Sequence, residues 1–202
     1  MSTASQRKLT VAEYLAREEQ SETKHEYCRG EVFAMAGGTF NHALIAANIL
    51  GLLKNHLQGS GCLAIGSDLR ISAKSIEFIT YPDVSVLCAE PQFDPQDRNA
   101  VTNPQAIIEV LSPSTERYDR TAKFGFFRTI PSLKLYVLVS QQEARVEVFT
   151  RGDNNSWQFS DAVGLNATIQ FPPLQCELPL AEIYEGVELD PTALRLKPDA
   201  ND

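Results

Sequence analysis

YPDVSVL (residues 81–87) and AIIEVL (residues 106–111) are the two segments that decide how this chain folds. Both are short and rich in aliphatic residues, which is typical of strands buried on both faces. Each carries one carboxylate: Asp83 near the start of the first segment and Glu109 inside the second. An ionised carboxylate among buried aliphatic side chains is costly unless it is paired, hydrogen-bonded or bound to a metal ion. If the two strands lie side by side, both carboxylates can reach one divalent cation.

The remaining pattern predicts a mixed β-sheet flanked by helices, an α/β (α+β) fold, preceded by a helix and a hairpin and followed by a β-rich C-terminal extension. We expect helices at residues 11–19, about 39–58, 117–129 and 180–184, and a hairpin over 24–36. Further strands are expected at residues 62–65, 67–72, 76–80, 135–140, 145–150, 157–159 and 168–171. Residues 89–105 contain three prolines without periodicity and predict a loop, and the tail from about residue 190 is expected to be flexible.

The composition places the chain among ordinary globular proteins. It has 202 residues, 43% hydrophobic and 22% charged, which suits one domain over residues 1–202. No apolar run reaches the ~20 residues that span a membrane, and the N-terminus has no apolar signal core, so we expect a cytoplasmic protein without membrane contact. The formal net charge of −8 weakens the case for nucleic-acid binding without excluding it, because a local basic face is enough.

The four cysteines at positions 28, 62, 88 and 176 include no CxxC pair. In a cytoplasmic protein this predicts reduced and mostly buried thiols.

Several blocks of the sequence together resemble one enzyme family. They are LTVAEYL (9–15), EVFAMAG (31–37), YPD (81–83), IEVLSPST (108–115) and PSLKLYV (131–137). The chain resembles the PD-(D/E)xK nuclease superfamily and, within it, the Uma-type restriction endonuclease family. The resemblance implies a nuclease core over about residues 40–140, a homodimer, a DNA substrate, and Mg²⁺ (or Mn²⁺) held by Asp83, Glu109 and the backbone carbonyl of Val110.

The superfamily pattern places a lysine two residues after the second acid, but Leu111 stands there in this chain. The resemblance points instead to Lys123 on the following helix. A helix packed on the strand can send such a long side chain back over the strand end. Lys123 would then orient a water or neutralise charge that develops on a phosphate.

Each of these residues also has a structural explanation. Asp83 can cap a strand or a turn, and Glu109 can form a buried pair with Arg70 or Lys123. Lys123 can be a solvated helix residue paired with Asp119 four positions earlier.

Further residues extend the candidate site. Glu31 can add a carboxylate beside the metal ligands. His42 can contact phosphate or make a local hydrogen bond at its helix start. Arg117, Arg120 and Arg128 give the 116–128 segment a net positive charge, suited either to DNA phosphates or to a solvated helix face.

Two functions are therefore in competition. The first is a Mg²⁺-dependent DNA endonuclease that uses Asp83, Glu109 and Lys123. The second is a nuclease-like fold that serves as a non-catalytic binding or structural module, which Leu111 and the acidic net charge favour.

Overall fold

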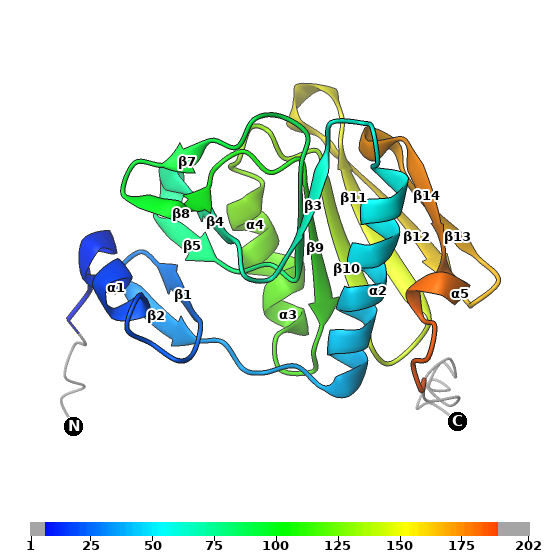
Figure 1. Ribbon diagram of the computed structural model, residues 1–202, viewed down its shortest axis with the longest axis horizontal. Coiled ribbons are helices and arrows are strands. Elements are labelled where there is room, and N and C mark those ends of the chain that lie inside the picture. The colour runs from blue at the N-terminus through cyan, green and yellow to red at the C-terminus, as the bar shows by residue number, and fades with distance from the viewer. Residues whose placement is uncertain (1–6, 190–202) are drawn as a thin grey trace, which may run out of the picture.

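The computed structural model describes residues 7–189, whose strands form two six-stranded sheets and one short hairpin (Figure 1). Sheet A has the order β2-β1-β5-β4-β8-β7. Its strands are β1 (His25–Cys28), β2 (Glu31–Ala34), β4 (Arg70–Ala73), β5 (Phe78–Thr80), β7 (Phe93–Asp94) and β8 (Asp97–Val101). Sheet B has the order β12-β11-β10-β9-β6-β3. Its strands are β3 (Leu63–Gly66), β6 (Val84–Leu87), β9 (Ala106–Leu111), β10 (Leu135–Ser140), β11 (Arg145–Arg151) and β12 (Trp157–Val163). The hairpin joins β13 (Thr168–Phe171) to β14 (Cys176–Pro179).

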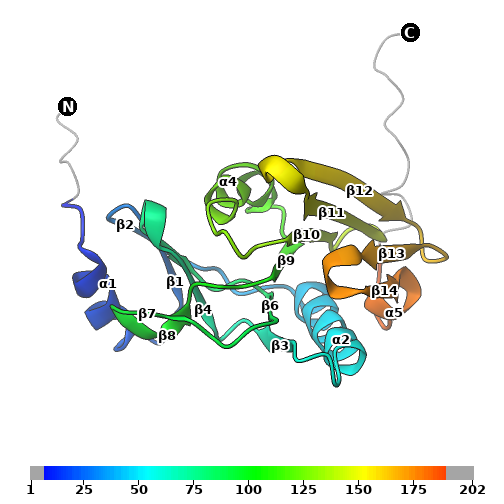
Figure 2. The same ribbon diagram turned by 90° about the horizontal axis from the view of Figure 1, so that it is seen from above.

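Helices cover both faces of sheet B (Figure 2). On one face lie α2 (Phe40–His56), α5 (Leu180–Ile183) and the β13–β14 hairpin, and their apolar side chains share one core with the sheet. On the other face lies a helical segment made of α3 (Glu116–Tyr118), a π-helical turn (Asp119–Lys123) and α4 (Phe124–Phe127). Here Phe127 packs with Tyr136 of β10 and with Phe78 of sheet A, so a second core joins the two sheets.

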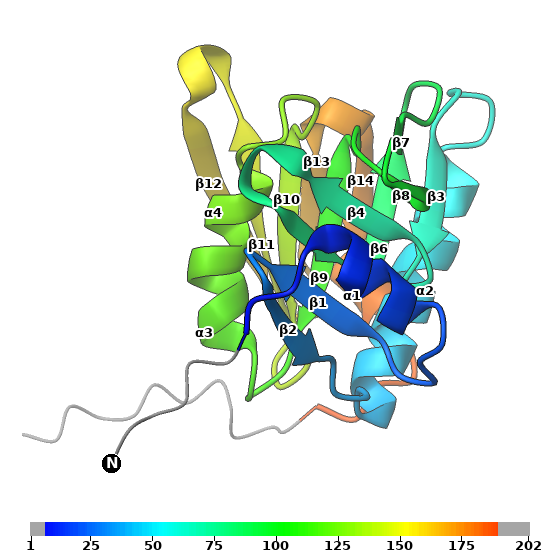
Figure 3. The same cartoon turned by 90° about the vertical axis from the view of Figure 1, so that its left-hand side faces the viewer.

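The N-terminal helix α1 (Val11–Glu18) covers the outer face of sheet A (Figure 3). Thr10 begins it with a capping box: its side chain accepts the Glu13 N–H, and the Glu13 carboxylate accepts the Thr10 N–H. Tyr14 stacks on Tyr27 of β1 with ring centroids 5.1 Å apart.

The strand period decides where the acidic residues of sheet B lie. In β9, Ile108 belongs to the core under α2, whereas Ile107 and Leu111 belong to the core under α4. Glu109 therefore shares the α4 face, because side chains two apart point the same way. β6 and β9 are antiparallel neighbours that pair Val84 with Ile108, so one step further Asp83 lies opposite Glu109.

The predicted fold class is confirmed: mixed sheets, flanking helices, an N-terminal helix and hairpin, and a β-rich C-terminal part. The loop expected over 89–105 was wrong, because it contains β7 and β8. These strands are polar, and side chains from β4 hold them: Ser72 donates to Asp94, and Arg70 to Asp97. Strands fixed by such bonds carry no apolar alternation. Strand β14 was not predicted either, and the flexible tail expected from about residue 190 lies outside the described residues.

The expectation of four reduced thiols was also wrong, because Cys62 and Cys88 form a disulfide. They lie beside each other because β3 and β6 are antiparallel and pair Leu63 with Leu87, the residues next to the two cysteines. Cys28 and Cys176 are free. Between residues 7 and 189, no helix has the length and apolar character needed to cross a bilayer.

Candidate active site

Asp83 lies at the point where β6 begins, directly before Val84. Its Oδ2 atom accepts the backbone N–H of Val110 at 2.7 Å. The side chain thus extends the β6–β9 hydrogen-bond ladder one position beyond the strand. This is a structural role of the kind considered from the sequence, and it also fixes the direction of the carboxylate.

His42 contacts the same carboxylate from the first turn of α2. Its Nε2 atom lies 3.3 Å from Asp83 Oδ2. Its backbone N–H donates to the hydroxyl of Thr39, which caps the helix. The hydrogen bond to Asp83 raises the pKa of His42, burial lowers it, and the Asp83 charge and a hydrogen bond to the Val110 backbone raise it further. The net shift is upward, which favours an imidazolium beside Asp83.

Glu109 and Lys123 form a buried ion pair. Their side chains are each 6% exposed, and Lys123 Nζ lies 2.8 Å from Glu109 Oε1 and 3.5 Å from Asp119 Oδ1. Burial raises the pKa of Glu109, Lys123 lowers it, and the charges of Asp83 and Asp119 raise it again; the net shift is upward. Burial lowers the pKa of Lys123, but Glu109, Asp119 and Glu26 raise it by more, so the ammonium stays charged.

The helical segment presents Lys123 through its π-helical turn. Asp119 and Lys123 begin and end this turn, and both are buried. The hydroxyl of Tyr136 on β10 donates to the Asp119 carbonyl at 3.0 Å, which fastens the turn to sheet B. Single π turns inside helices are frequent at functional sites.

The side chains of His42, Asp83, Glu109, Asp119 and Lys123 line a cavity of about 850 Å³ between the two sheets. Its lining includes the site residues expected from the sequence: Glu31, His42, Asp83, Glu109, Val110 and Lys123. The remaining wall comes from the β1–β2 hairpin, the segment that leads from β2 to α2 (Figure 1), the SPST segment after β9 and the α3–α4 region.

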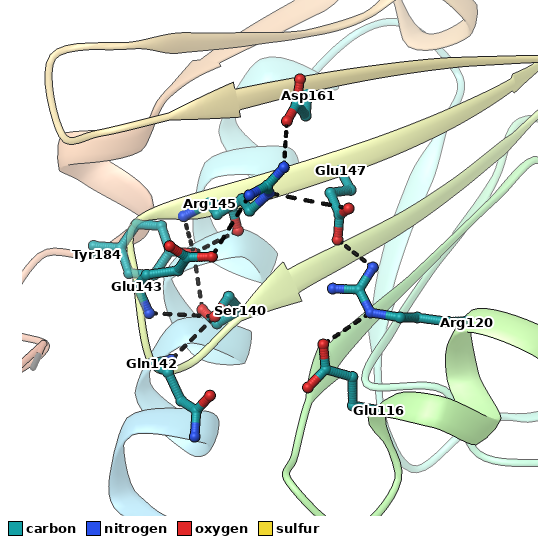
Figure 4. A network of polar contacts seen from close by, with 9 residues as sticks. All are labelled: Glu116, Arg120, Ser140, Gln142, Glu143, Arg145, Glu147, Asp161 and Tyr184. Atoms are coloured by element: carbon teal, nitrogen blue, oxygen red, sulfur yellow. Dashed lines mark hydrogen bonds and ion pairs between the residues drawn. The ribbon is translucent and has the colours of Figure 1, made fainter. Parts of the chain in front are cut away.

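The three arginines considered for DNA contact lie outside this lining. Arg120 Nε is 2.8 Å from Glu116 Oε1, and its guanidinium also pairs with Glu147 on β11 (Figure 4). Arg128 lies over the Phe124 ring, 5.6 Å from its centroid, and Arg117 is exposed. Arg120 is thus occupied by two carboxylates, whereas Arg117 and Arg128 face outward.

Two residues of the cavity were missed at the sequence level. The Tyr118 hydroxyl donates to Oε1 of Glu26, a buried residue of β1. This bond ties the helical segment to sheet A. A faint signal exists in the HEYC segment, because strand alternation there places Glu26 and Cys28 on one face. Nothing local indicates that this face would meet Tyr118, 92 residues later.

The donor set fits a hard cation. Asp83, Glu109 and the Val110 carbonyl offer oxygen atoms, and Mg²⁺ binds through one or two carboxylates while it keeps several waters. Glu109 Oε1 is buried and has no partner with hydrogen-bond geometry, its contact with Lys123 being an ion pair. Among residues 7–189 no three His, Cys, Asp or Glu side chains group as a ready-made metal cage.

One known family covers most of the chain. Residues 11–181 match the Uma2 family, described as "Putative restriction endonuclease". The chain belongs to the Uma2 family. Its relatives include two Synechocystis proteins, "Uncharacterized protein sll1609" and "Uncharacterized protein slr1290". The first is 40% identical over 163 residues, which cover 81% of this chain and 92% of the relative. The second is 41% identical over 153 residues, which cover 74% and 78%.

A solved structure shares the fold of this Uma2 chain. It is a crystal structure from Anabaena variabilis described as "a putative nuclease belonging to DUF820". The TM-score is 0.71, the identity 17%, and the match covers 87% of this chain and 97% of the other. At that identity the likeness establishes the fold alone.

Proposed function

We propose that this Uma2 protein is a metal-dependent DNA endonuclease of the PD-(D/E)xK type, with Asp83, Glu109 and Lys123 as its catalytic residues. The observation that carries this proposal is the meeting of two carboxylates from adjacent strands with one buried ammonium in a single cavity. The nuclease description of the family supports it. The reaction adds one water across a P–O bond and leaves a phosphomonoester and a hydroxyl.

Asp83, Glu109 and the Val110 carbonyl would hold Mg²⁺ or Mn²⁺. A bound ion supplies Lewis-acid polarisation of the phosphoryl group and a more acidic water. The chain orients its own ligands, because the Val110 N–H and His42 both contact Asp83 Oδ2. Glu31, exposed at the cavity wall, is an accessory carboxylate in this proposal.

Lys123 has the electrostatic role. Its ammonium is held by Glu109 and Asp119, so its position is set before substrate arrives. A preorganised positive charge at a phosphate stabilises the transition state more than a mobile one does, because no reorganisation is needed during the reaction. Leu111 leaves the superfamily's usual lysine position apolar, and Lys123 fills the role from the helix.

In this proposal the protein acts on DNA as a homodimer. Cutting both strands of DNA takes two active sites, which a twofold-symmetric homodimer supplies. Arg117 and Arg128 are the outward-facing cations nearest in sequence to Lys123, and in this proposal they contact phosphates outside the cavity. The cytoplasmic location stays a prediction, and the Cys62–Cys88 disulfide does not support it.

The alternative is a non-catalytic module with the same fold. One observation favours it: Lys123 already pairs with both Glu109 and Asp119, so the charge of these two buried carboxylates is partly neutralised without a metal ion. A buried ion pair of this kind can simply be part of the core.

Titration of the metal-free protein with Mn²⁺ by calorimetry separates the two functions. The nuclease proposal predicts saturable binding that Asp83→Asn and Glu109→Gln each abolish. Lys54→Ala, on the exposed side of α2, serves as the control and should bind as the wild type does. Equal heats for wild type and Asp83→Asn would favour the non-catalytic module.

A further inference from the structure

The β1–β2 wall of the cavity carries an exposed aromatic ring. In the β1–β2 hairpin, Phe33 pairs with Glu26, and Glu31 pairs with Cys28. These four residues share the cavity face, whereas Tyr27 belongs to the core under α1. Phe33 is 50% exposed, although it lies beside the buried Glu26. A half-exposed phenyl ring on a cavity wall is an unused apolar contact surface.

This apolar wall continues along the chain. Beyond Phe33 the cavity is lined by five consecutive residues without charge, AMAGG at 34–38. Phe126 and the ring of Tyr118 line it from the helical side. The cavity therefore has an aromatic side, formed by Phe33, Phe126 and Tyr118, and its carboxylates lie both on that side, at Glu26 and Glu31, and at Asp83 and Glu109.

Size and charge restrict what can enter. A volume of about 850 Å³ is in the range of sites that enclose a small organic molecule. Glu109 is almost fully buried, so a phosphodiester has to enter the cavity to reach it. Double-helical DNA is gripped mainly through arginine and lysine contacts to its phosphates. Lys123 is the one lysine or arginine in this lining, against five carboxylates: Glu26, Glu31, Asp83, Glu109 and Asp119.

A single strand also needs positive charge at its phosphates, but it offers a contact that a paired duplex does not. Its bases stack on aromatic side chains, and each stacked base contributes about 1–3 kcal/mol irrespective of sequence. A nucleotide freed from its duplex can bring its phosphate to the carboxylates while its base lies on the aromatic side.

We propose that the cavity binds an unpaired nucleotide whose base stacks on Phe33, so that this protein prefers single-stranded or frayed DNA to a fully paired duplex. This inference rests on the proposed nuclease function and narrows its substrate class. Phe33 is a binding residue for the base, with Phe126 and the AMAGG segment closing the sides of the subsite.

Binding is measured by fluorescence anisotropy in Ca²⁺, with a labelled oligonucleotide as a single strand and within a blunt duplex. We expect the single strand to bind at least ~10-fold more tightly. Phe33→Ala should weaken single-strand binding about 5- to 150-fold, the range that stacking energies imply, and leave duplex binding unchanged. Phe33→Trp should retain it. Phe93→Ala, at the 54% exposed Phe93 of β7 outside the cavity, is the matched control.

Three results would overturn the inference. They are a duplex preference or no binding in the wild type, equal effects of Phe33→Ala and Phe93→Ala, and a change of oligomeric state in Phe33→Ala without loss of single-strand binding. The last would make the ring a contact with a second copy. Cleavage in Mg²⁺ separates this failure from failure of the proposed function. Metal-dependent cleavage at equal rates on the single strand and the duplex would contradict only the base subsite. Phe33-dependent binding without any cleavage would contradict only the nuclease proposal.

Discussion

The Asp83 carboxylate accepts the backbone N–H of Val110 at 2.7 Å, directly before the first residue of β6 and beside the continuing strand β9. One side-chain atom thereby replaces the next rung of the ladder. It connects two of the proposed cation ligands and holds Asp83 opposite the third, Glu109. The fold and the site therefore depend on the same hydrogen bond. Its structural role and its role in holding the proposed cation ligands can be separated by mutation of Asp83.

Asp83→Asn should leave stability nearly unchanged, because the amide oxygen still accepts the Val110 N–H. Asp83→Ala removes that acceptor, and a buried N–H without a partner costs about 1–3 kcal/mol. Urea unfolding of the two variants should therefore differ by that amount, with Asp83→Ala the less stable. If they unfold at the same urea concentration, the bond has no structural role.

The imidazole of His42 should titrate above its ordinary pKa of 6.5, because of its hydrogen bond to Asp83. The chain has three histidines, so NMR titration can assign His42 by comparison with a His42→Gln variant. In Asp83→Asn the pKa of His42 should fall, since the charge is gone and burial, which lowers it, remains. An unchanged His42 pKa in that variant would contradict the contact.

Lys123→Ala should lower the free energy of unfolding by about 3–5 kcal/mol at neutral pH, because it leaves Glu109 and Asp119 buried without their cation. The sequence alone allowed a solvated helix lysine, for which the loss would be about 0.2–0.5 kcal/mol. Combining the change with Glu109→Gln should recover part of the loss. A Lys123→Ala protein within 1 kcal/mol of wild type would show that the ion pair contributes little to stability.

Because the pKa of Glu109 is raised, both the stability of the protein and its affinity for Mn²⁺ should depend on pH. The folded protein holds this proton more tightly than the unfolded chain, so the Glu109 contribution to stability falls as pH rises from the ordinary value of 4.5 through the raised pKa. Mn²⁺ affinity should rise over the same range, because the proton competes with the cation. Asp119→Asn removes a charge that raises the pKa of Glu109 and should move both curves to lower pH. Affinity that is flat from pH 4.5 upward would contradict the raised pKa of Glu109.

The meeting of Asp83 and Glu109 could be predicted because it depends on short-range rules. Both lie in apolar segments that read as buried strands, and strand alternation fixes the face of each. Lys123 could also be predicted, because the next helix has to cover the same sheet. For these three residues, local pattern and tertiary position agree.

The remainder of the cavity depends on contacts that no local pattern encodes. Glu26 meets Tyr118 only because the N-terminal hairpin adds to sheet A through β5. Arg120 looked available for DNA, but β11 brings Glu147 beside it. The disulfide likewise follows from the register of β3 and β6, since Cys62 and Cys88 are 26 residues apart in sequence.

Cleavage of single-stranded and supercoiled DNA shows whether Asp83 serves metal-dependent hydrolysis. Wild type and Asp83→Asn are purified in parallel and assayed with Mg²⁺, Mn²⁺ and EDTA. We expect cutting by the wild type in either metal, no cutting in EDTA, and loss of activity in Asp83→Asn although its stability is retained. Cutting that persists in EDTA or in Asp83→Asn would contradict this expectation, as would a wild type that binds Mn²⁺ at Asp83 and cuts neither substrate.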